Sequence, residues 1–120
     1  TDRRRCTPMG DLGVRESVVE KYLIAELRKV DHKIICKKIN GPGWRGWPDR
    51  MVLLPCGLCH WLEIKRPRGG KFEPLQLRNH KVLRGMGFFV RVVNTKKLVD
   101  EYVEETNEYL RSVRRPGTRG

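Results

Sequence analysis

The sequence lacks long apolar runs and has few acidic residues. No run approaches the roughly 20 apolar residues that a membrane-spanning helix needs, which excludes such a span. Residues 1–6 carry arginines with no apolar stretch behind them, so we expect no secretory signal and a cytoplasmic protein. Asp and Glu number 14 against 26 Lys and Arg, and the formal net charge of +12 on 120 residues indicates a polyanionic partner, most often nucleic acid.

Cysteine is also scarce, with four residues in the chain. Cys56 and Cys59 have the C-x₂-C spacing of half a zinc site, but the other candidate ligands are dispersed along the chain. We therefore expect no zinc. A disulfide between Cys56 and Cys59 is not expected either, because the cytoplasm keeps thiols reduced.

The positive charge is concentrated in one block. Residues 65–97 hold ten Lys and Arg against one acidic residue, whereas residues 98–110 hold five acidic residues and no basic one. An acidic partner should therefore bind the 65–97 block, and the acidic stretch should face elsewhere. We expect no membrane partner, because no strongly basic amphipathic helix is present to lie on a membrane surface.

The length favours a single folded domain, since domains typically run to about 100–150 residues. We expect this domain to span residues 14–113. Residues 1–13 and 114–120 are basic and lack apolar periodicity, and we interpret them as an N-terminal arm and a C-terminal tail. They are either mobile arms with a role or tails that only keep the protein soluble.

Hydrophobic periodicity predicts seven elements in the order α-β-β-β-α-β-α. The predicted helices cover residues 15–30, residues 74–86 and a last segment that runs from a cap at Asn94 or Thr95 to about residue 113. The predicted strands cover residues 33–39, 51–54, 60–65 and 88–93. The second helix should bury Leu75, Leu77, His80, Val82 and Leu83. The last helix should align Leu98, Tyr102, Thr106, Tyr109 and Val113 on one face.

Three charged residues interrupt the apolar strand pattern: Asp49, Glu63 and Lys65. A hairpin folded symmetrically about Gly57 places Asp49 opposite Lys65 and Met51 opposite Glu63, with all four side chains on one face. The other face is apolar and consists of Val52, Leu54, Leu62 and Ile64. The three charges should therefore converge at one end of the sheet, an inference that a register slip of one residue would undo.

Two carboxylates and an ammonium group in one patch suit metal-assisted hydrolysis of phosphodiesters. Mg²⁺ takes oxygen ligands, usually from one or two carboxylates, waters and a substrate phosphate. It activates a bound water and shields the anionic substrate from the carboxylates. A positioned ammonium stabilises charge that develops on the phosphate. The alternative is a structural ion-pair network at the edge of the sheet.

Four short motifs together resemble the VRR-NUC (virus-type replication-repair nuclease) family of the PD-(D/E)xK nuclease superfamily. They are ESVVE at residues 16–20, GWPDR at 46–50, LEIK at 62–65 and PLQ at 74–76. The resemblance covers about residues 14–95, and the chain looks like the short stand-alone members from phages or bacteria. It implies an α/β fold with a restriction-endonuclease-like PD-(D/E)xK core and an extra C-terminal helix. It also implies that the protein acts in the cytoplasm of a bacterial or phage-infected cell.

The resemblance also implies roles for individual residues. It assigns the catalytic set to Glu20, Asp49, Glu63, Lys65 and Gln76. The implied ligands of Mg²⁺ or Mn²⁺ are Asp49, Glu63, the backbone carbonyl of Ile64 and Glu20. Lys65 would be the catalytic lysine, and Gln76 would support the site. Glu16, one turn before Glu20, is the reserve candidate for the first-helix glutamate.

Basic side chains near these motifs are the expected DNA contacts. The candidates are Arg45, Arg66, Arg68, Lys71, Arg78, Lys81 and Arg84. Trp44 and Trp47 either stack on a displaced base or pack to close the site.

The resemblance implies a homodimeric enzyme that cuts four-way (Holliday) junctions. The alternatives are a nuclease for flaps or other branched repair substrates and a non-catalytic DNA-binding module with the same fold. The last helix either packs on a sister subunit or covers its own sheet.

Overall fold

The computed structural model describes residues 15–67 and 70–114. The elements follow the predicted order: α1 (Glu16–Val30), β1 (Ile35–Lys38), β2 (Arg50–Leu54), a 3₁₀ turn η3 (Pro55–Gly57), β3 (Leu58–Ile64), α2 (Pro74–Gly85), β4 (Phe89–Val93) and α3 (Lys96–Arg114). The predicted arm, residues 1–13, lies outside the described residues. So does the predicted tail, apart from Arg114, which belongs to α3. Within the described ranges, every helix is too short or too polar to cross a membrane.

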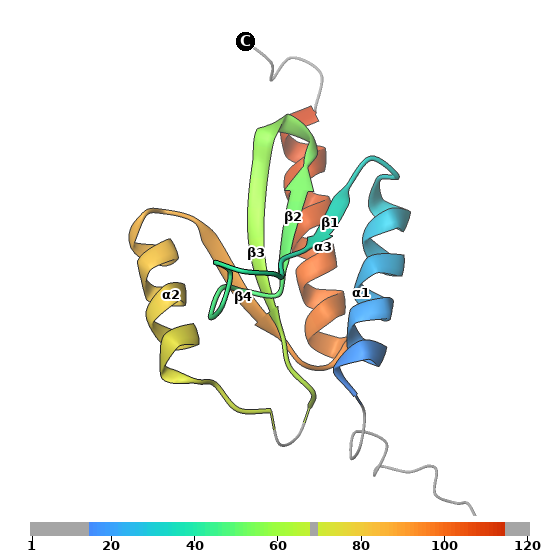
Figure 1. Cartoon of the computed structure of the whole chain (residues 1–120). Coiled ribbons are helices and arrows are strands. Elements are labelled where there is room, and N and C mark those ends of the chain that lie inside the picture. Colours follow the sequence, from blue (N-terminus) through green and yellow to red (C-terminus); the bar gives the residue numbers. More distant parts are fainter. Residues whose placement is uncertain (1–14, 68–69, 115–120) are drawn as a thin grey trace, which may run out of the picture.

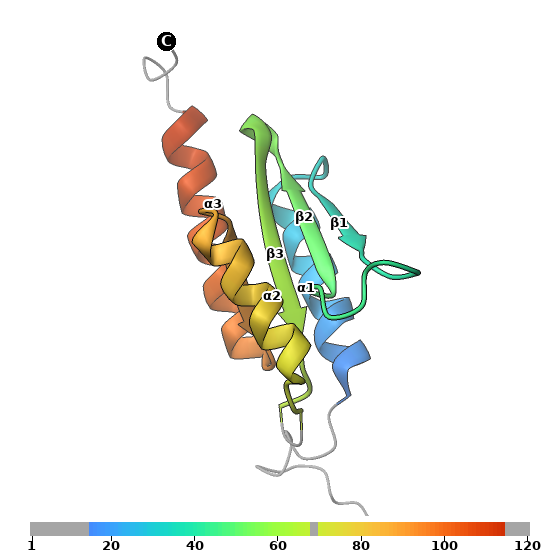
Figure 2. The same cartoon turned by 60° about the vertical axis from the view of Figure 1, so that its left-hand side comes forward.

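The strands form one mixed sheet in the order β1-β2-β3-β4. The pairs β1–β2 and β2–β3 are antiparallel, whereas β3 and β4 are parallel. A parallel pair needs a crossover connection, and α2 lies in the connection between β3 and β4. Figure 1 shows α1 and α3 as neighbours and α2 apart from them, and Figure 2 gives the turned view.

The two faces of the sheet bury different sets of side chains. The main core joins the sheet to α1 and α3 and includes Leu23, Leu27, Val52, Leu54, Leu62, Ile64, Val93, Val99 and Tyr102. The predicted apolar face of the hairpin is thereby confirmed. A second, smaller cluster under α2 consists of Trp61, Leu83 and Val90. Because side chains alternate along a strand, Glu63 lies on the same face as Trp61, toward α2.

The hairpin turn is not centred on Gly57 as predicted. Leu54 pairs with Leu58, so the centre of the turn is Cys56, a non-glycine residue at φ +75°. Residues other than glycine seldom adopt this left-handed backbone conformation. The sequence therefore favoured Gly57 over Cys56 as the centre of the turn.

The strand register is consequently shifted by two residues. Met51 pairs with Trp61, so the prediction that it lies opposite Glu63 was wrong. A shift of two residues leaves each side chain on its predicted face, whereas a shift of one would not. Continuing the observed ladder places Asp49 level with Glu63 rather than with Lys65.

The helix α2 buries a narrower stripe than predicted. His80 and Leu83 are buried, but Leu77 is 54% exposed and Val82 is 46% exposed. The predicted burial of Leu77 and Val82 was wrong. His80 and Leu83 share one side of the helix, and Leu77 and Val82 lie outside that stripe.

The helix α3 covers its own sheet and packs against α1. Val99, Tyr102 and Leu110 are buried in the main core. At the start of the helix, the Thr95 hydroxyl accepts a hydrogen bond from the Leu98 backbone N–H at 3.1 Å, as the capping prediction required. The alternative that this helix covers its own sheet is confirmed, while its contact with a sister subunit stays a prediction.

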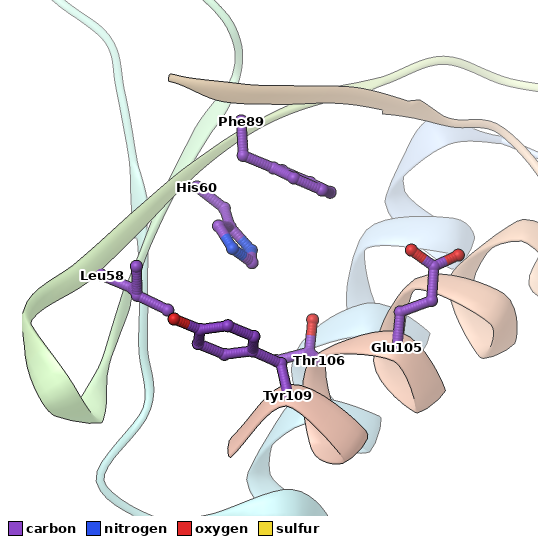
Figure 3. Close-up of a pocket in the computed structure, with 6 residues that line it drawn as sticks. All are labelled: Leu58, His60, Phe89, Glu105, Thr106 and Tyr109. Carbon is purple, nitrogen blue, oxygen red and sulfur yellow. The ribbon is translucent and has the colours of Figure 1, made fainter. Parts of the chain in front are cut away.

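A cavity of about 370 Å³ opens between the strands β3 and β4 and the helix α3 (Figure 3). Its lining consists of Leu58, His60, Phe89, Glu105, Thr106 and Tyr109. The His60 ring stacks on Phe89 with centroids 4.1 Å apart, and its Nδ1 lies 2.7 Å from the Tyr102 hydroxyl. Tyr109, one of the residues predicted to share a face of α3, is 48% exposed. Burial lowers the pKa of His60 from 6.5 to about 4.

Acidification is expected to destabilise the protein through His60. Because the pKa of His60 is lower in the folded than in the unfolded state, the folded state binds fewer protons. The stabilising contribution is complete above about pH 6.5 and is lost as the pH falls toward 4. Thermal melts between pH 7 and pH 4 should show a smaller loss of Tm in the non-titrating variant His60→Phe than in wild type. Parallel losses in the two proteins would contradict this role.

Candidate active site

Two carboxyl groups meet at the ends of β2 and β3, on the face toward α2. Asp49 directly precedes β2, where its backbone carbonyl accepts a hydrogen bond from Ile39 N at 2.8 Å. Its Oδ2 accepts a second one from Ile64 N at 2.7 Å. Glu63, on β3, is only 1% exposed, and its carboxyl is hydrogen-bonded to that of Asp49. The predicted convergence of the two acids is confirmed.

The surroundings of Glu63 favour the neutral, protonated form of its carboxyl group. Burial, the charge of Asp49 and the hydrogen bond with Asp49 raise the pKa of Glu63 from 4.5 to about 8, against an opposing effect of Lys65. Two adjacent ionised carboxylates repel each other strongly where water is excluded. The pair therefore favours either a proton or a cation between its oxygens.

Lys65 and Gln76 complete a bonded cluster with Glu63. Lys65 Nζ lies 3.6 Å from Glu63 Oε2 and donates to Gln76 Oε1 at 3.2 Å. Gln76 Nε2 donates to Glu63 Oε2 at 3.2 Å. The same amide takes part in a capping box with Glu73, whose backbone N–H donates to Gln76 Oε1 at 3.0 Å. The start of α2 and the orientation of the cluster are thus fixed by one side chain.

The loop before β2 is held against α2 at Gly46. This residue has φ +83°, and a Cβ placed on it would lie 2.5 Å from Leu75 Cγ, so only glycine fits. Trp47 packs against Trp61, with ring centroids 5.8 Å apart. Trp44 is 42% exposed. The packing interpretation therefore applies to Trp47, while stacking on a base stays a prediction for Trp44.

Glu20 forms an ion pair with Arg50. Its Oε2 accepts from Arg50 Nε at 2.8 Å, and Arg50 Nη1 also donates to a backbone carbonyl in β1. This ion pair ties α1 to β2 one residue after Asp49. Among the described contacts of Glu20, none reaches the Glu63 cluster, and its role as a metal ligand stays a prediction. Glu16, the reserve candidate, is exposed in the first turn of α1.

Sequence reasoning did not assign His80 and Phe72 to the site. His80 Nε2 lies 3.2 Å from Glu63 Oε1. The Phe72 ring lies 5.1 Å from Lys65 Nζ and meets the His80 ring edge-on at 5.9 Å. His80 follows Gln76 by four residues, and this spacing places both on one side of the helix, a signal that was available in the sequence. Phe72 gave no such signal.

Most of the predicted DNA contacts are exposed. The exposed ones are Arg45 in the loop before β2, Arg66 and Lys71 between β3 and α2, and Arg78, Lys81 and Arg84 on α2. Arg68 lies outside the described residues, and Arg84 donates to the Val90 carbonyl. The acidic stretch lies on α3, across the sheet from α2, where Glu105 pairs with Arg91 at 2.9 Å. The separation of basic and acidic surfaces agrees with the prediction from charge.

The donor set suits a hard divalent cation that needs few protein ligands. Within residues 15–67 and 70–114, no three His, Cys, Asp or Glu side chains form a cluster that could hold a metal ion. Asp49 and Glu63 nevertheless offer carboxyl oxygens at one place, and Mg²⁺ commonly takes one or two carboxylates with water and phosphate. The Ile64 carbonyl stays a predicted third donor. A cation between the carboxylates would also replace a proton on Glu63.

Two known proteins are similar to this chain over most of their own length. No family model matches the sequence. A curated protein described as "Putative nuclease p44", from Acyrthosiphon pisum secondary endosymbiont phage 1, is 42% identical over 85 residues, which make up 71% of this chain and 88% of that protein. A solved structure described as "VRR_NUC domain" superposes with a TM-score of 0.67 at 34% sequence identity, covering 74% of this chain and 94% of that one.

Proposed function

The chain belongs to the VRR-NUC family of PD-(D/E)xK nucleases, and on this premise we propose that it is a metal-dependent DNA endonuclease that cuts branched DNA. The family and the α/β PD-(D/E)xK fold predicted from the sequence are confirmed. The observation that carries the proposed chemistry is the contact between the Asp49 and Glu63 carboxyls beside the Lys65 ammonium.

The residues of the cluster have two different roles in the proposed hydrolysis. Asp49, Glu63 and the Ile64 carbonyl would hold the cation. Mg²⁺ or Mn²⁺, when bound, would polarise the phosphate and acidify a bound water. The Lys65 ammonium is fixed by Gln76 Oε1 and stabilises negative charge that develops on the phosphate.

Branched DNA is the proposed substrate class. The exposed arginines and lysines on α2 and in the loops before β2 and after β3 suit contacts to phosphate, which bind DNA without regard to its sequence. Trp44, exposed in the loop that leads to Asp49, suits stacking on an unpaired base of the kind that branch points offer. Recognition would then rest on the shape of the DNA.

We further propose that the active form is a homodimer. One site cuts one strand, so the symmetric cutting of a four-way junction needs two sites related by a two-fold axis. A dimer with isologous contacts supplies this arrangement.

A panel of DNA substrates tests the proposal. We expect the protein to cut a four-way junction at least about tenfold faster in Mg²⁺ than a linear duplex of the same sequence, and light scattering to give twice the mass of one chain. Faster cutting of a flap would favour the alternative repair nuclease. Junction binding without cleavage under Mg²⁺ and Mn²⁺ would favour the non-catalytic module, and a monomeric mass would contradict the paired cut.

A further inference from the structure

The helix α2 presents two polar side chains to Glu63 from successive turns. Gln76 Nε2 donates to Glu63 Oε2, and His80 Nε2 lies within hydrogen-bond distance of Glu63 Oε1, each at 3.2 Å. Both oxygens of the carboxyl are therefore engaged by the same helix. A carboxyl held at both oxygens has a fixed orientation, whereas one held at a single oxygen can rotate.

His80 is buried to an extent that demands a polar partner. The residue is 2% exposed, and the Phe72 ring meets its ring edge-on. An imidazole removed from water without a hydrogen bond is costly, so an apolar residue would suit this position better if packing alone were required. The partner that the structure provides is Glu63.

We propose that His80 is a positioning residue that orients the Glu63 carboxylate for binding of the divalent cation. Metal-ligating carboxylates are themselves commonly hydrogen-bonded, and loss of such a supporting partner typically lowers metal affinity or activity by about 10–100-fold. The inference rests on the proposed function, because it takes Glu63 as a ligand.

The molecule contains a matched control. His60 is a second histidine partly removed from solvent, but it lies on the opposite face of the sheet, against Phe89 and Tyr102. Its replacement removes a partly buried imidazole and a hydrogen bond while leaving the contacts of Glu63 in place. Any loss that reflects only the removal of a histidine from the fold should therefore appear in both variants.

Calorimetric titration of the DNA-free protein with Mn²⁺ at pH 8.5 tests the proposal. We expect His80→Phe, which keeps a ring but has no donor, to weaken Mn²⁺ binding by about 10–100-fold. His80→Gln, whose amide can reach Glu63, should stay within about threefold of wild type, and the shorter His80→Asn should behave like His80→Phe. His60→Phe should bind Mn²⁺ as wild type does, and thermal melts identify any variant that does not fold. His80→Asn replaces His80→Phe in the comparison if the latter is unfolded.

The outcomes separate the two proposals. If wild type binds Mn²⁺ and folded His80→Phe and His80→Asn bind it equally well, the positioning role is overturned while the metal site stands. Equal weakening in His80→Phe and His60→Phe would also overturn it, because the effect would be structural. If wild type binds no Mn²⁺, the proposed metal site fails, and the role of His80 fails with it.

Discussion

The Glu63→Gln variant is expected to lose DNA cleavage by more than about 100-fold and, without metal, to melt at a higher temperature than wild type at pH 8. The loss should exceed the 10–100-fold that follows removal of a group that only supports a ligand. The gain in stability has a separate cause. Glu63 has a raised pKa, so the folded state binds more protons than the unfolded state between pH 4.5 and about 8. Stability that depends on Glu63 is complete below pH 4.5 and falls as the pH rises through about 8.

The neutral amide of Glu63→Gln does not ionise, so this variant does not lose stability as the pH rises through about 8. Its NH₂ group can donate to Asp49 as the protonated acid does. Melts in EDTA at pH 5, 7 and 9 should show the difference between Glu63→Gln and wild type growing with pH. Mn²⁺ should raise the Tm of wild type and leave Glu63→Gln unchanged. Glu104→Gln, which removes an exposed acid from α3, is the control and should behave as wild type. If Mn²⁺ raises the Tm of Glu63→Gln as much as that of wild type, the assignment of Glu63 as a ligand is contradicted.

The Lys65→Met variant is expected to lose about 10²–10³-fold in the rate of cleavage while retaining metal and DNA binding. Methionine keeps the unbranched stem beside Phe72 but removes the ammonium that lies 3.6 Å from Glu63. That ammonium lowers the pKa of Glu63, so its removal raises this pKa further. The comparison with wild type is therefore made at pH 9, to favour the ionised form of Glu63.

Single-turnover cleavage with saturating Mg²⁺ measures the rate, and calorimetry with Mn²⁺ measures the affinity. An exposed lysine on α2, changed in Lys81→Met, controls for the loss of one positive charge from the DNA surface. A loss of less than about fivefold in Lys65→Met would show that the ammonium takes no part in the chemistry. A large loss confined to metal affinity would make Lys65 a support for Glu63 instead.

The order and type of the secondary-structure elements followed from hydrophobic periodicity because each element buries a regular stripe or face. The register of the hairpin did not follow. It depends on Cys56 occupying a left-handed conformation, to which a neighbouring glycine is intrinsically better suited. Each strand side chain still lies on its predicted face of the sheet, because the predicted register was wrong by an even number of residues.

The candidate site was predictable where charge conflicted with the apolar strand pattern, as at Asp49 and Glu63. It was less predictable where a residue satisfied two patterns at once. His80 fits the buried stripe of α2 and also contacts Glu63, and the apolar interpretation of that stripe concealed the second role. The Glu20–Arg50 ion pair was not foreseen either, because it joins residues 30 positions apart on different elements.

Cleavage of a four-way junction by wild type and Asp49→Asn in Mg²⁺, Mn²⁺ and EDTA tests whether Asp49 and Glu63 form a metal-dependent nuclease site. The amide oxygen of the variant can still accept the hydrogen bond from Ile64 N, so the fold should be retained. We expect cleavage by wild type with either metal, none in EDTA, and a loss of more than about 100-fold in Asp49→Asn with junction binding intact. Equal cleavage by the two proteins, or cleavage by wild type in EDTA, would contradict a metal-dependent nuclease site at Asp49 and Glu63.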